Sequence, residues 1–192
     1  LGKPIRLTRP QRLFGQERET VDTGYPGDIV GLTNVGAFVL GDSLIEKGDV
    51  RFEGVSPFSP EIFARLVNRS VDKYKHFEKG IHQLCDEGLT EIYFDPQSAT
   101  RDPILGVVGR LQFDVVQYRL ESEYGVKTIL EPMSYDLIRF LEGDVADVYW
   151  GSNARYVESR RGHPAVLVRD EWTLGYLTDK NPGLSFRPLE DR

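Results

Sequence analysis

The chain has 192 residues, of which 40% are hydrophobic and 28% charged, an ordinary composition for one large globular domain or two small ones. Its formal net charge of −6 excludes a protein that binds nucleic acid over its whole surface, while local basic patches stay possible. The single cysteine, Cys85, excludes an intrachain disulfide framework and a zinc site of several cysteines, and it favours a reducing cytoplasm.

The chain begins at Leu1, and its only methionine is Met133. Because its first residues also read as the second half of a domain, we expect the chain to be a fragment of a longer protein. It contains no run of about 18 apolar residues and no signal-peptide pattern, so its sequence predicts neither a membrane span nor export.

Residues 1–47 are predicted to form the C-terminal part of a β-barrel. Short runs of alternating apolar and polar residues are separated by glycine turns. Pro26-Gly27 is a strong turn signal, because proline presets the first corner and glycine allows positive φ at the second. The expected strands lie at residues 5–7, near 20–22, at 28–32 and at 37–40.

Residues 48–192 are predicted to form a second domain, with a core at 60–141 and a C-terminal extension at 142–192. The expected core elements are a strand at 62–67, a helix from the N-cap Ser70 to Glu87, strands at 91–94 and 104–108, a helix within 109–125, and a strand from Val126. This βαββαβ order predicts a ferredoxin-like split sandwich, in which two helices cover one face of a four-stranded sheet. The fold class is therefore α+β.

The stretch 109–126 has the clearest pattern in the chain. Apolar residues recur at three- and four-residue spacing, at Phe113, Val116, Leu120 and Tyr124. Gly125 follows the last of them, where a left-handed C-cap favours a residue without Cβ. We therefore expect an amphipathic helix that rests on a sheet.

Beyond this core the pattern weakens. We expect a strand at 135–141 paired with the strand that starts at Val126, a short helix at 145–150, a strand at 165–168 and a helical turn or two at 172–177. The extension offers few apolar candidates for core positions, so we expect it to pack on the split βαβ core.

Residues 109–116, with 119–120 and 122–126 behind them, resemble the third domain of the bacterial peptide chain release factor 3 family. More distantly, they are similar to the corresponding helix of elongation factor G. Residues 25–32 and 41–44 resemble the end of the β-barrel second domain of the same translation factors. The resemblance implies that this chain holds the end of a second domain followed by a third domain.

In the family that the chain resembles, the complete protein is a GTP-hydrolysing factor that acts on the ribosome at termination and promotes release and recycling of the factors that read stop codons. The resemblance implies that GTP, GDP and Mg²⁺ bind in a G domain that this chain lacks. We therefore expect no catalytic, cofactor-binding or metal-binding residue here, and no enzyme activity. The resemblance also implies a cytoplasmic monomer that contacts small-subunit rRNA and protein and stays off membranes.

Basic residues cluster near the N-terminus. Residues 3–18 contain a single acidic residue, Glu17, and five basic residues, which are Lys3, Arg6, Arg9, Arg12 and Arg18. The planar fork of arginine pairs with phosphates, which favours docking on structured RNA, whereas the alternative is a solvated barrel edge protected by charge. Because the resemblance implies that the second domain lies against the small ribosomal subunit, the predicted ribosome contacts are Arg6, Arg9 and Arg12.

A second, sparser cluster of arginines lies in the C-terminal extension, and we interpret it as a solvated surface. Its members are Arg155, Arg160, Arg161 and Arg169. His82 and Cys85 lie three residues apart on a predicted helix, but no third metal ligand is placed, so a core thiol beside an exposed imidazole is favoured.

The residues leave other functions to consider. A phosphate loop is not present, since Gly2-Lys3 is followed by Pro4 and has no glycine loop upstream. The alternatives are a fragment of an elongation factor G-like translocase and a stand-alone ferredoxin-like enzyme of the acylphosphatase type. Such an enzyme needs an arginine in a phosphate-cradling loop, and Asn68-Arg69-Ser70 has the residue types without a glycine-rich cradle.

Overall fold

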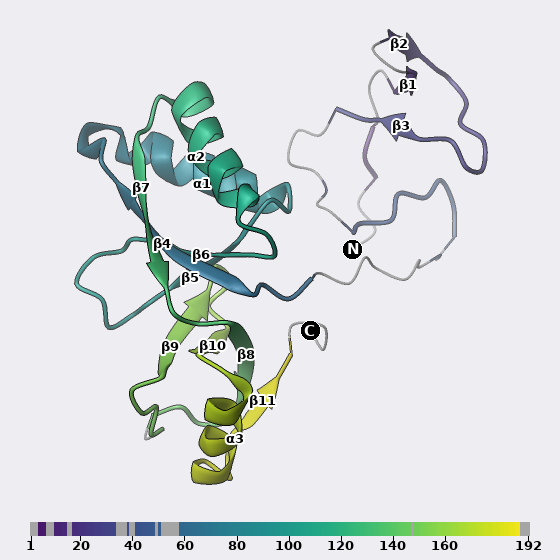
Figure 1. Cartoon of the computed structure of the whole chain (residues 1–192). Coiled ribbons are helices and arrows are strands. Elements are labelled where there is room, and N and C mark those ends of the chain that lie inside the picture. Colours follow the sequence, from purple (N-terminus) through teal and green to yellow (C-terminus); the bar gives the residue numbers. More distant parts are fainter. Residues whose placement is uncertain are drawn as a thin grey trace. The chain divides into compact units, whose positions relative to one another are not determined.

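The structure is a computed structural model that describes residues 4–6, 10–14, 17–33, 38, 41–48, 50, 58–146 and 148–188. The chain divides into two compact units, Leu1–Phe52 and Glu53–Arg192 (Figure 1).

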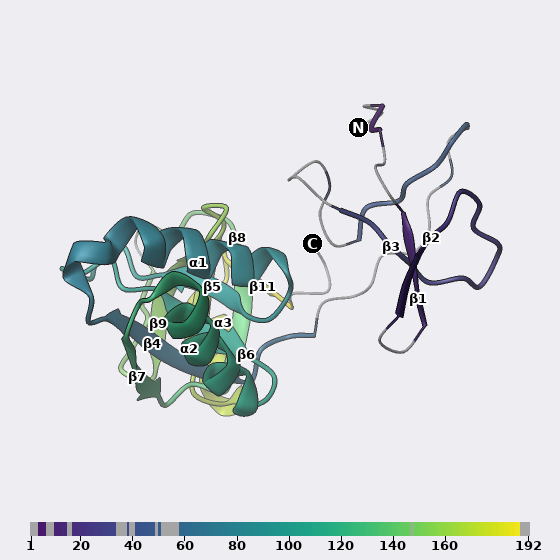
Figure 2. The same cartoon turned by 90° about the horizontal axis from the view of Figure 1, so that it is seen from above.

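The N-terminal unit contains a three-stranded antiparallel sheet in the order β2-β1-β3 (Figure 2). Its strands are β1 (Gln11–Phe14), β2 (Glu17–Thr20) and β3 (Val30–Gly31). The N–H of Asp28 donates to the carbonyl of Tyr25 at 2.9 Å, and Gly27 has φ +92°. These two features confirm the predicted Pro26-Gly27 turn.

Two of the four strands expected in this unit are present but shifted or shortened, as β2 and β3. Ile5 lies in no strand, since the neighbouring Pro4 has no N–H to give to a ladder. Phe38 also lies in no strand, while the other expected positions, residue 7 and residues 37 and 39–40, lie outside the described residues.

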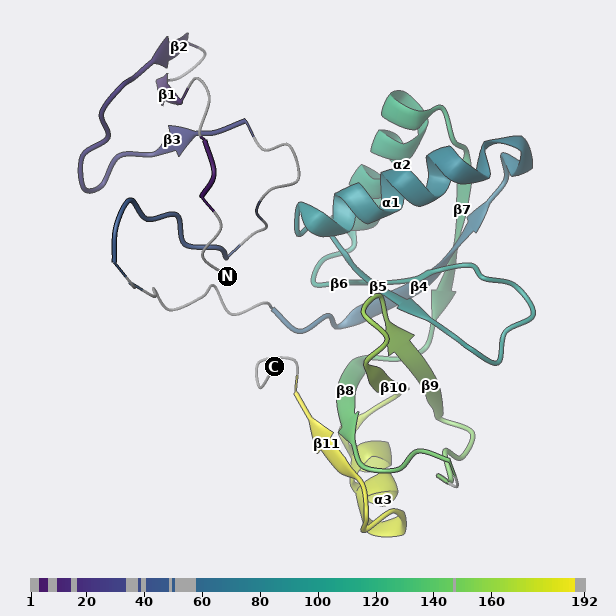
Figure 3. The ribbon, with the colours of Figure 1, turned by 180° about the vertical axis from the view of Figure 1, so that it is seen from behind.

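The C-terminal unit is built on an eight-stranded sheet in the order β11-β8-β10-β9-β5-β6-β4-β7 (Figure 3). Its strands are β4 (Ile62–Asn68), β5 (Glu91–Phe94), β6 (Ile104–Val107), β7 (Thr128–Met133), β8 (Leu137–Glu142), β9 (Ala154–Ser159), β10 (Pro164–Val168) and β11 (Ser185–Arg187). Its helices are a 3₁₀ turn at Val71–Lys73, α1 (Tyr74–Asp86), α2 (Leu111–Tyr124) and α3 (Glu171–Lys180).

The first half of this unit runs β4-α1-β5-β6-α2-β7, and α1 and α2 lie side by side over one face of the sheet (Figure 1). The strands predicted at 62–67, 91–94 and 104–108 and the two predicted helices are confirmed. Between the helices and the sheet lies one apolar cluster. Its most buried members include Leu66, Leu84, Leu105, Val116 and Leu120.

The ends of the two helices differ in how well the sequence predicted them. Gly125 has φ +64°, and its N–H donates to the carbonyl of Glu121 at 3.0 Å, which confirms the predicted left-handed C-cap. Ser70 is not the N-cap of α1. Its hydroxyl instead accepts from the N–H of Lys127 at 3.1 Å, and α1 begins at Tyr74 after the 3₁₀ turn.

The C-terminal extension departs most from expectation. Strand β8 pairs with β10 and β11, so the predicted pairing with the strand after Val126 is wrong. Ile138 and Phe140 are buried in a second apolar cluster with Phe63 and Tyr93, and β8 lies near the opposite end of the sheet from β7. Residues 145, 146 and 148–150 form no helix, and Val145, Val148 and Trp150 pack against a third apolar cluster.

The extension also supplies many core residues, contrary to expectation. Alternate residues of β10 serve two cores: Ala165 and Leu167 join Phe63 and Tyr93, whereas Val166 and Val168 pack with Leu177 of α3. Strand β9 joins the sheet by pairing with β5, with Phe94 opposite Glu158. The sheet is therefore covered on both faces, and the predicted four-stranded sheet is half of a larger one.

Candidate functional site

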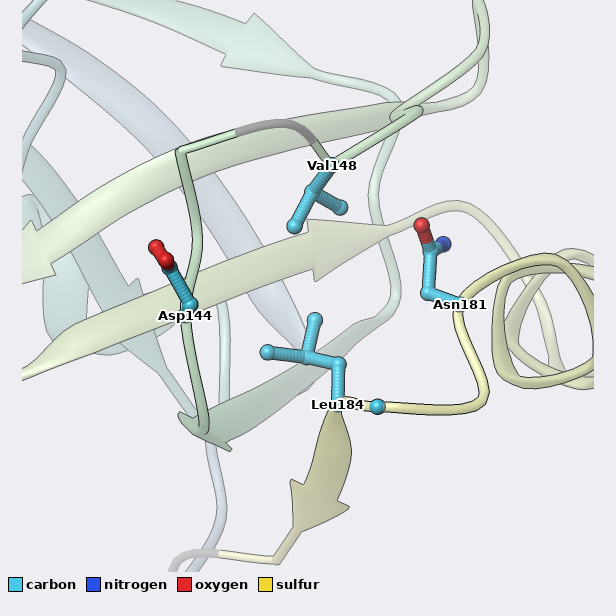
Figure 4. A pocket seen from close by; sticks show the side chains of 5 residues that line it. Asp144, Val148, Asn181 and Leu184 are labelled. Atoms are coloured by element: carbon cyan, nitrogen blue, oxygen red, sulfur yellow. The ribbon is translucent and has the colours of Figure 1, made fainter.

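One shallow pocket among the described residues lies between the end of β8 and the end of α3 and has a volume of about 240 Å³ (Figure 4). Its lining residues are Asp144, Val148, Asn181, Gly183 and Leu184. Asp144 accepts from the N–H of Ala146 at 2.9 Å, and the amide of Asn181 donates to the carbonyl of Leu177 at 2.8 Å. Both polar side chains thus hold neighbouring backbone, and we assign no ligand to this pocket.

The predicted pair His82 and Cys85 does not form a metal centre with other residues of the described chain, where no group of three or more potential ligands occurs. Cys85 packs against the core between the helices and the sheet. Burial raises the pKa of its thiol to about 11, so the thiolate is scarce at neutral pH. Cys85 is a core residue, as its place in the apolar stripe predicts.

Asn68-Arg69-Ser70, which has the residue types of a phosphate-binding loop without its glycines, forms a local bend at the end of β4. The side-chain oxygen of Asn68 accepts from the N–H of Ser70 at 2.8 Å, and the N–H of Arg69 donates to the carbonyl of Lys127 at 2.9 Å. These backbone N–H groups therefore already have partners within the fold. This geometry does not favour the acylphosphatase-type alternative.

The N-terminal arginines differ in their surroundings. Arg6 is exposed, Arg9 and Lys3 lie outside the described residues, and Arg12 is paired. Nη2 of Arg12 lies 2.8 Å from Oδ2 of Asp28, and the same oxygen accepts from the N–H of Tyr25 at 2.9 Å. The bond from Tyr25, together with that from Arg12, lowers the pKa of Asp28 below its usual value. Arg12 thus ties β1 to the Pro26-Gly27 turn.

Two of the four arginines in the second cluster bond to other residues of the fold. Arg155 lies 2.7 Å from the carboxylate of Asp95, a residue of the loop 95–103, and Arg160 donates to Asp86 and to the carbonyl of His82. Arg161 and Arg169 are exposed. The first two arginines thus hold the extension to the loop and to α1, whereas the predicted solvated surface describes only Arg161 and Arg169.

Arg119 on α2 connects the helix layer. Its guanidinium donates to Glu87 at the end of α1 and, at 2.6 Å, to Glu123 one turn further along α2. The bond from Arg119 lowers the pKa of both carboxyl groups. This network was not predicted, because it joins positions 32 residues apart in the sequence.

Outside this network, α2 exposes a row of apolar side chains that sequence reasoning missed. Leu111 and Tyr118 are 77% and 72% exposed, and Val108 and Val115 lie on the same side. These residues recur at three- and four-residue spacing, as the buried residues of the same helix do, and only the buried set was recognised in the sequence.

None of the helices in the described residues is both long and apolar enough to cross a membrane.

Comparisons with known proteins match both units. Residues 1–47 match the family model of elongation factor G domain 2, and residues 52–178 match the model described as class II release factor RF3, C-terminal domain. The chain is thus part of a translation factor. Because the second match covers more than half of it, the chain belongs to the peptide chain release factor 3 family.

Curated relatives support the same family over nearly the whole chain. Peptide chain release factor 3 of Synechococcus elongatus is 46% identical over 191 residues, which cover 98% of this chain and 34% of the relative. Those of Symbiobacterium thermophilum and Nostoc punctiforme are 43% and 44% identical and cover 97% and 98% of this chain. The chain spans about a third of the length of these relatives. The predicted family is confirmed, and the elongation factor G-like alternative is not favoured.

Proposed function

We propose that this chain is the ribosome-docking and coupling module of a peptide chain release factor 3. The observation that carries the proposal is the pair of family matches, which follow one another in the order second domain, then release-factor C-terminal domain. In this proposal the complete factor hydrolyses GTP and promotes release and recycling of stop-codon-reading release factors in the cytoplasm. GTP, GDP and Mg²⁺ bind in its G domain, outside this chain.

The finer fold assignment belongs to the proposal. Residues 1–47 are the end of a translation-factor β-barrel, and residues 48–192 are a ferredoxin-like split sandwich with an extension. The strand order β5-β6-β4-β7, with two helices on one face, supports the split sandwich. Pairing of β9 with β5 and burial on both faces support a stiff body. A stiff body suits a module that transmits the nucleotide state of a neighbouring domain.

Docking on the small ribosomal subunit is proposed through Arg6, Arg9 and Arg12, acting as a monomeric factor on rRNA and protein. Arg6 is exposed and fits this role directly. The Arg12–Asp28 pair gives Arg12 a second possible role, in holding the turn. The test must therefore separate contact with phosphate from support of the fold.

The experiment is co-sedimentation of the chain with 70S ribosomes at low and moderate salt. We expect weak, salt-sensitive binding that the Arg6→Ala/Arg9→Ala/Arg12→Ala variant loses. Exposed arginines elsewhere provide the matched control, so Arg161→Ala/Arg169→Ala is expected to bind as the unaltered chain does. Binding that survives the triple variant would exclude these arginines as the docking residues.

Asp28→Asn distinguishes the two roles of Arg12. It removes the carboxylate charge that pairs with the guanidinium but keeps a side-chain oxygen that can accept from the N–H of Tyr25, so a phosphate-contacting Arg12 keeps or gains affinity. If Arg12 only supports the turn, Asp28→Asn and Arg12→Ala both weaken ribosome binding.

A further inference from the structure

Helix α2 is apolar on two opposite faces. One face buries Phe113, Val116 and Leu120 against the sheet. The opposite face carries what we call the outer row, which consists of Val108 just before the helix and Leu111, Val115 and Tyr118 within it. At 3.6 residues per turn, positions 111, 115 and 118 point away from the buried set.

The neighbouring helix shows that this pattern is not general to the layer. The side of α1 that faces away from its buried residues Phe77, Ile81 and Leu84 carries Lys75, Lys79 and Asp86. Since α1 and α2 lie on the same face of the sheet (Figure 2), one outward surface is charged and the other apolar. An apolar row of this kind on a helix that is already packed indicates an interaction surface.

The side chains of the outer row are exposed enough to contact a partner. Leu111 is 77% exposed, Tyr118 72%, Val108 45% and Val115 42%. No described part of the C-terminal unit, to which α2 belongs, covers these side chains. Tyrosine is one of the residues that most often supply the central contacts of protein interfaces, and apolar neighbours around it exclude water.

Charge along the long edges of the outer row indicates what kind of partner fits. Asp114 and Glu121 lie on the edge toward β7, and Glu87 and Glu123 lie on the edge toward α1. Arg119 is shared between Glu87 and Glu123, which leaves that edge with one carboxylate in excess.

Two further cations lie at the ends of the row. Lys127 contacts Glu121 only at 3.9 Å, and Arg110 is exposed just before α2. Counted together, the four carboxylates at the two edges outnumber these three cations by one. An RNA backbone is disfavoured there, because its phosphates would meet carboxylates. A second copy of the chain is also disfavoured, because a symmetric contact would place like edges together.

We propose that the outer row of α2 docks on a protein surface of the ribosome that presents apolar side chains inside a basic border. The inference rests on the proposed function in its choice of the ribosome as the place of docking. It is independent of the N-terminal arginines, which lie in the other unit. A basic border matches the acidic edges and steers association, while the apolar centre supplies most of the affinity.

The test is site-specific photo-crosslinking with purified 70S ribosomes. A photoreactive phenylalanine analogue replaces Tyr118 in one protein and Trp172, which is 75% exposed on α3, in the control. We expect the analogue at 118 to give an adduct that resists ribonuclease, is digested by protease and contains a ribosomal protein rich in lysine and arginine. An RNA adduct, a dimer of this chain, or the same adduct from both positions would overturn the inference.

Ribosome binding by substituted proteins tests how much the outer row contributes to affinity. Leu111→Ser/Tyr118→Ser is expected to weaken ribosome binding about tenfold or more, while Trp172→Ser leaves it unchanged. Asp114→Lys/Glu121→Lys is expected to weaken binding most at low salt, because it removes charge complementarity. All of these side chains are exposed, so the far-ultraviolet circular dichroism and the urea midpoint are expected to stay the same.

The two proposals fail in different ways. If the unaltered chain does not co-sediment with ribosomes at low salt, the docking function and this inference are both wrong. If it co-sediments and the Leu111→Ser/Tyr118→Ser protein binds equally well, only this inference is wrong.

Discussion

A Cβ added to Gly80 would lie 2.7 Å from Cδ2 of Leu120, so the glycine allows α1 and α2 to pack at their present separation. Leu120 is fully buried, and ring atoms of Tyr124 lie 3.0 Å from the same point. We expect Gly80→Ala to lower the free energy of unfolding by about 1–2 kcal/mol through overpacking, despite the better helix propensity of alanine. Urea unfolding of both proteins measures the difference.

Gly175 in α3 provides the matched control. A Cβ at this position meets nothing within 4 Å, so Gly175→Ala adds helix propensity without a clash. We expect it to raise the free energy of unfolding by about 0.5–1 kcal/mol. If both substitutions stabilise the protein, the helix separation does not depend on Gly80.

The Arg119 network is expected to stabilise the helix layer at neutral pH. Arg119→Ala removes the bonds to Glu87 and Glu123, and we expect a loss of about 0.5–1 kcal/mol in the free energy of unfolding. Both carboxyl groups have lowered pKa values, so their contribution is present above the ordinary pKa of glutamate and is lost as the pH falls through the folded values. Thermal unfolding between neutral and acidic pH is the measurement.

Lys127→Ala is the control for that network. The ammonium of Lys127 lies 3.9 Å from Glu121, and both side chains are mostly exposed, so this pair should contribute little to the free energy of unfolding.

The difference in the free energy of unfolding between the unaltered protein and Arg119→Ala should become smaller toward low pH. An equal gap at all pH values would contradict the ionic role of Arg119.

Asp28 provides a titration that reports on the N-terminal turn. Its pKa is lowered by the N–H of Tyr25 and by Arg12, so its ionised form favours the folded state above the ordinary pKa of aspartate, and this contribution is lost as the pH falls through the folded value. We expect Arg12→Ala to raise the pKa of Asp28 only part of the way, because the bond from Tyr25 remains. Carbon-detected NMR titration measures both values, and an unchanged pKa would refute the pairing.

The thiol of Cys85 is expected to react slowly with alkylating reagents in the folded protein. With its pKa raised to about 11 by burial, the thiolate fraction at pH 8 is far below that of a free cysteine. Labelling by iodoacetamide should be at least about 100-fold slower in native protein than in urea. Equal rates in the two states would show that α1 does not bury this side chain.

Local patterns in the sequence predicted much of the first half of the C-terminal unit. The stripe of Phe113, Val116 and Leu120 and the glycine at position 125 are determined by helix periodicity and by the left-handed C-cap, which depend only on nearby residues. The same local rules failed at Ser70, since its hydroxyl bonds to Lys127, a residue 57 positions away. No property of the stretch around Ser70 reveals that partner.

The extension shows why the rest could not be predicted. The run from Pro164 to Val168 reads correctly as a strand, but its alternation between two cores requires knowing that Leu177 of α3 packs on one face of β10 and that Phe63 and Tyr93 pack on the other. Likewise, Arg12 reads as a free cation until Asp28 folds back against it. Pairing across a sheet depends on which distant segments meet, and periodicity carries no information about that.

By itself, then, the sequence determined the family, the central helix and the strands around it, because these follow from contiguous residues. Only the tertiary structure decided the eight-stranded sheet, the pairing of Arg12 and Arg119, and the outward direction of Leu111 and Tyr118. These features arise from contacts between residues far apart in the chain. The free energy of burying them together, not any local preference, selects the arrangement.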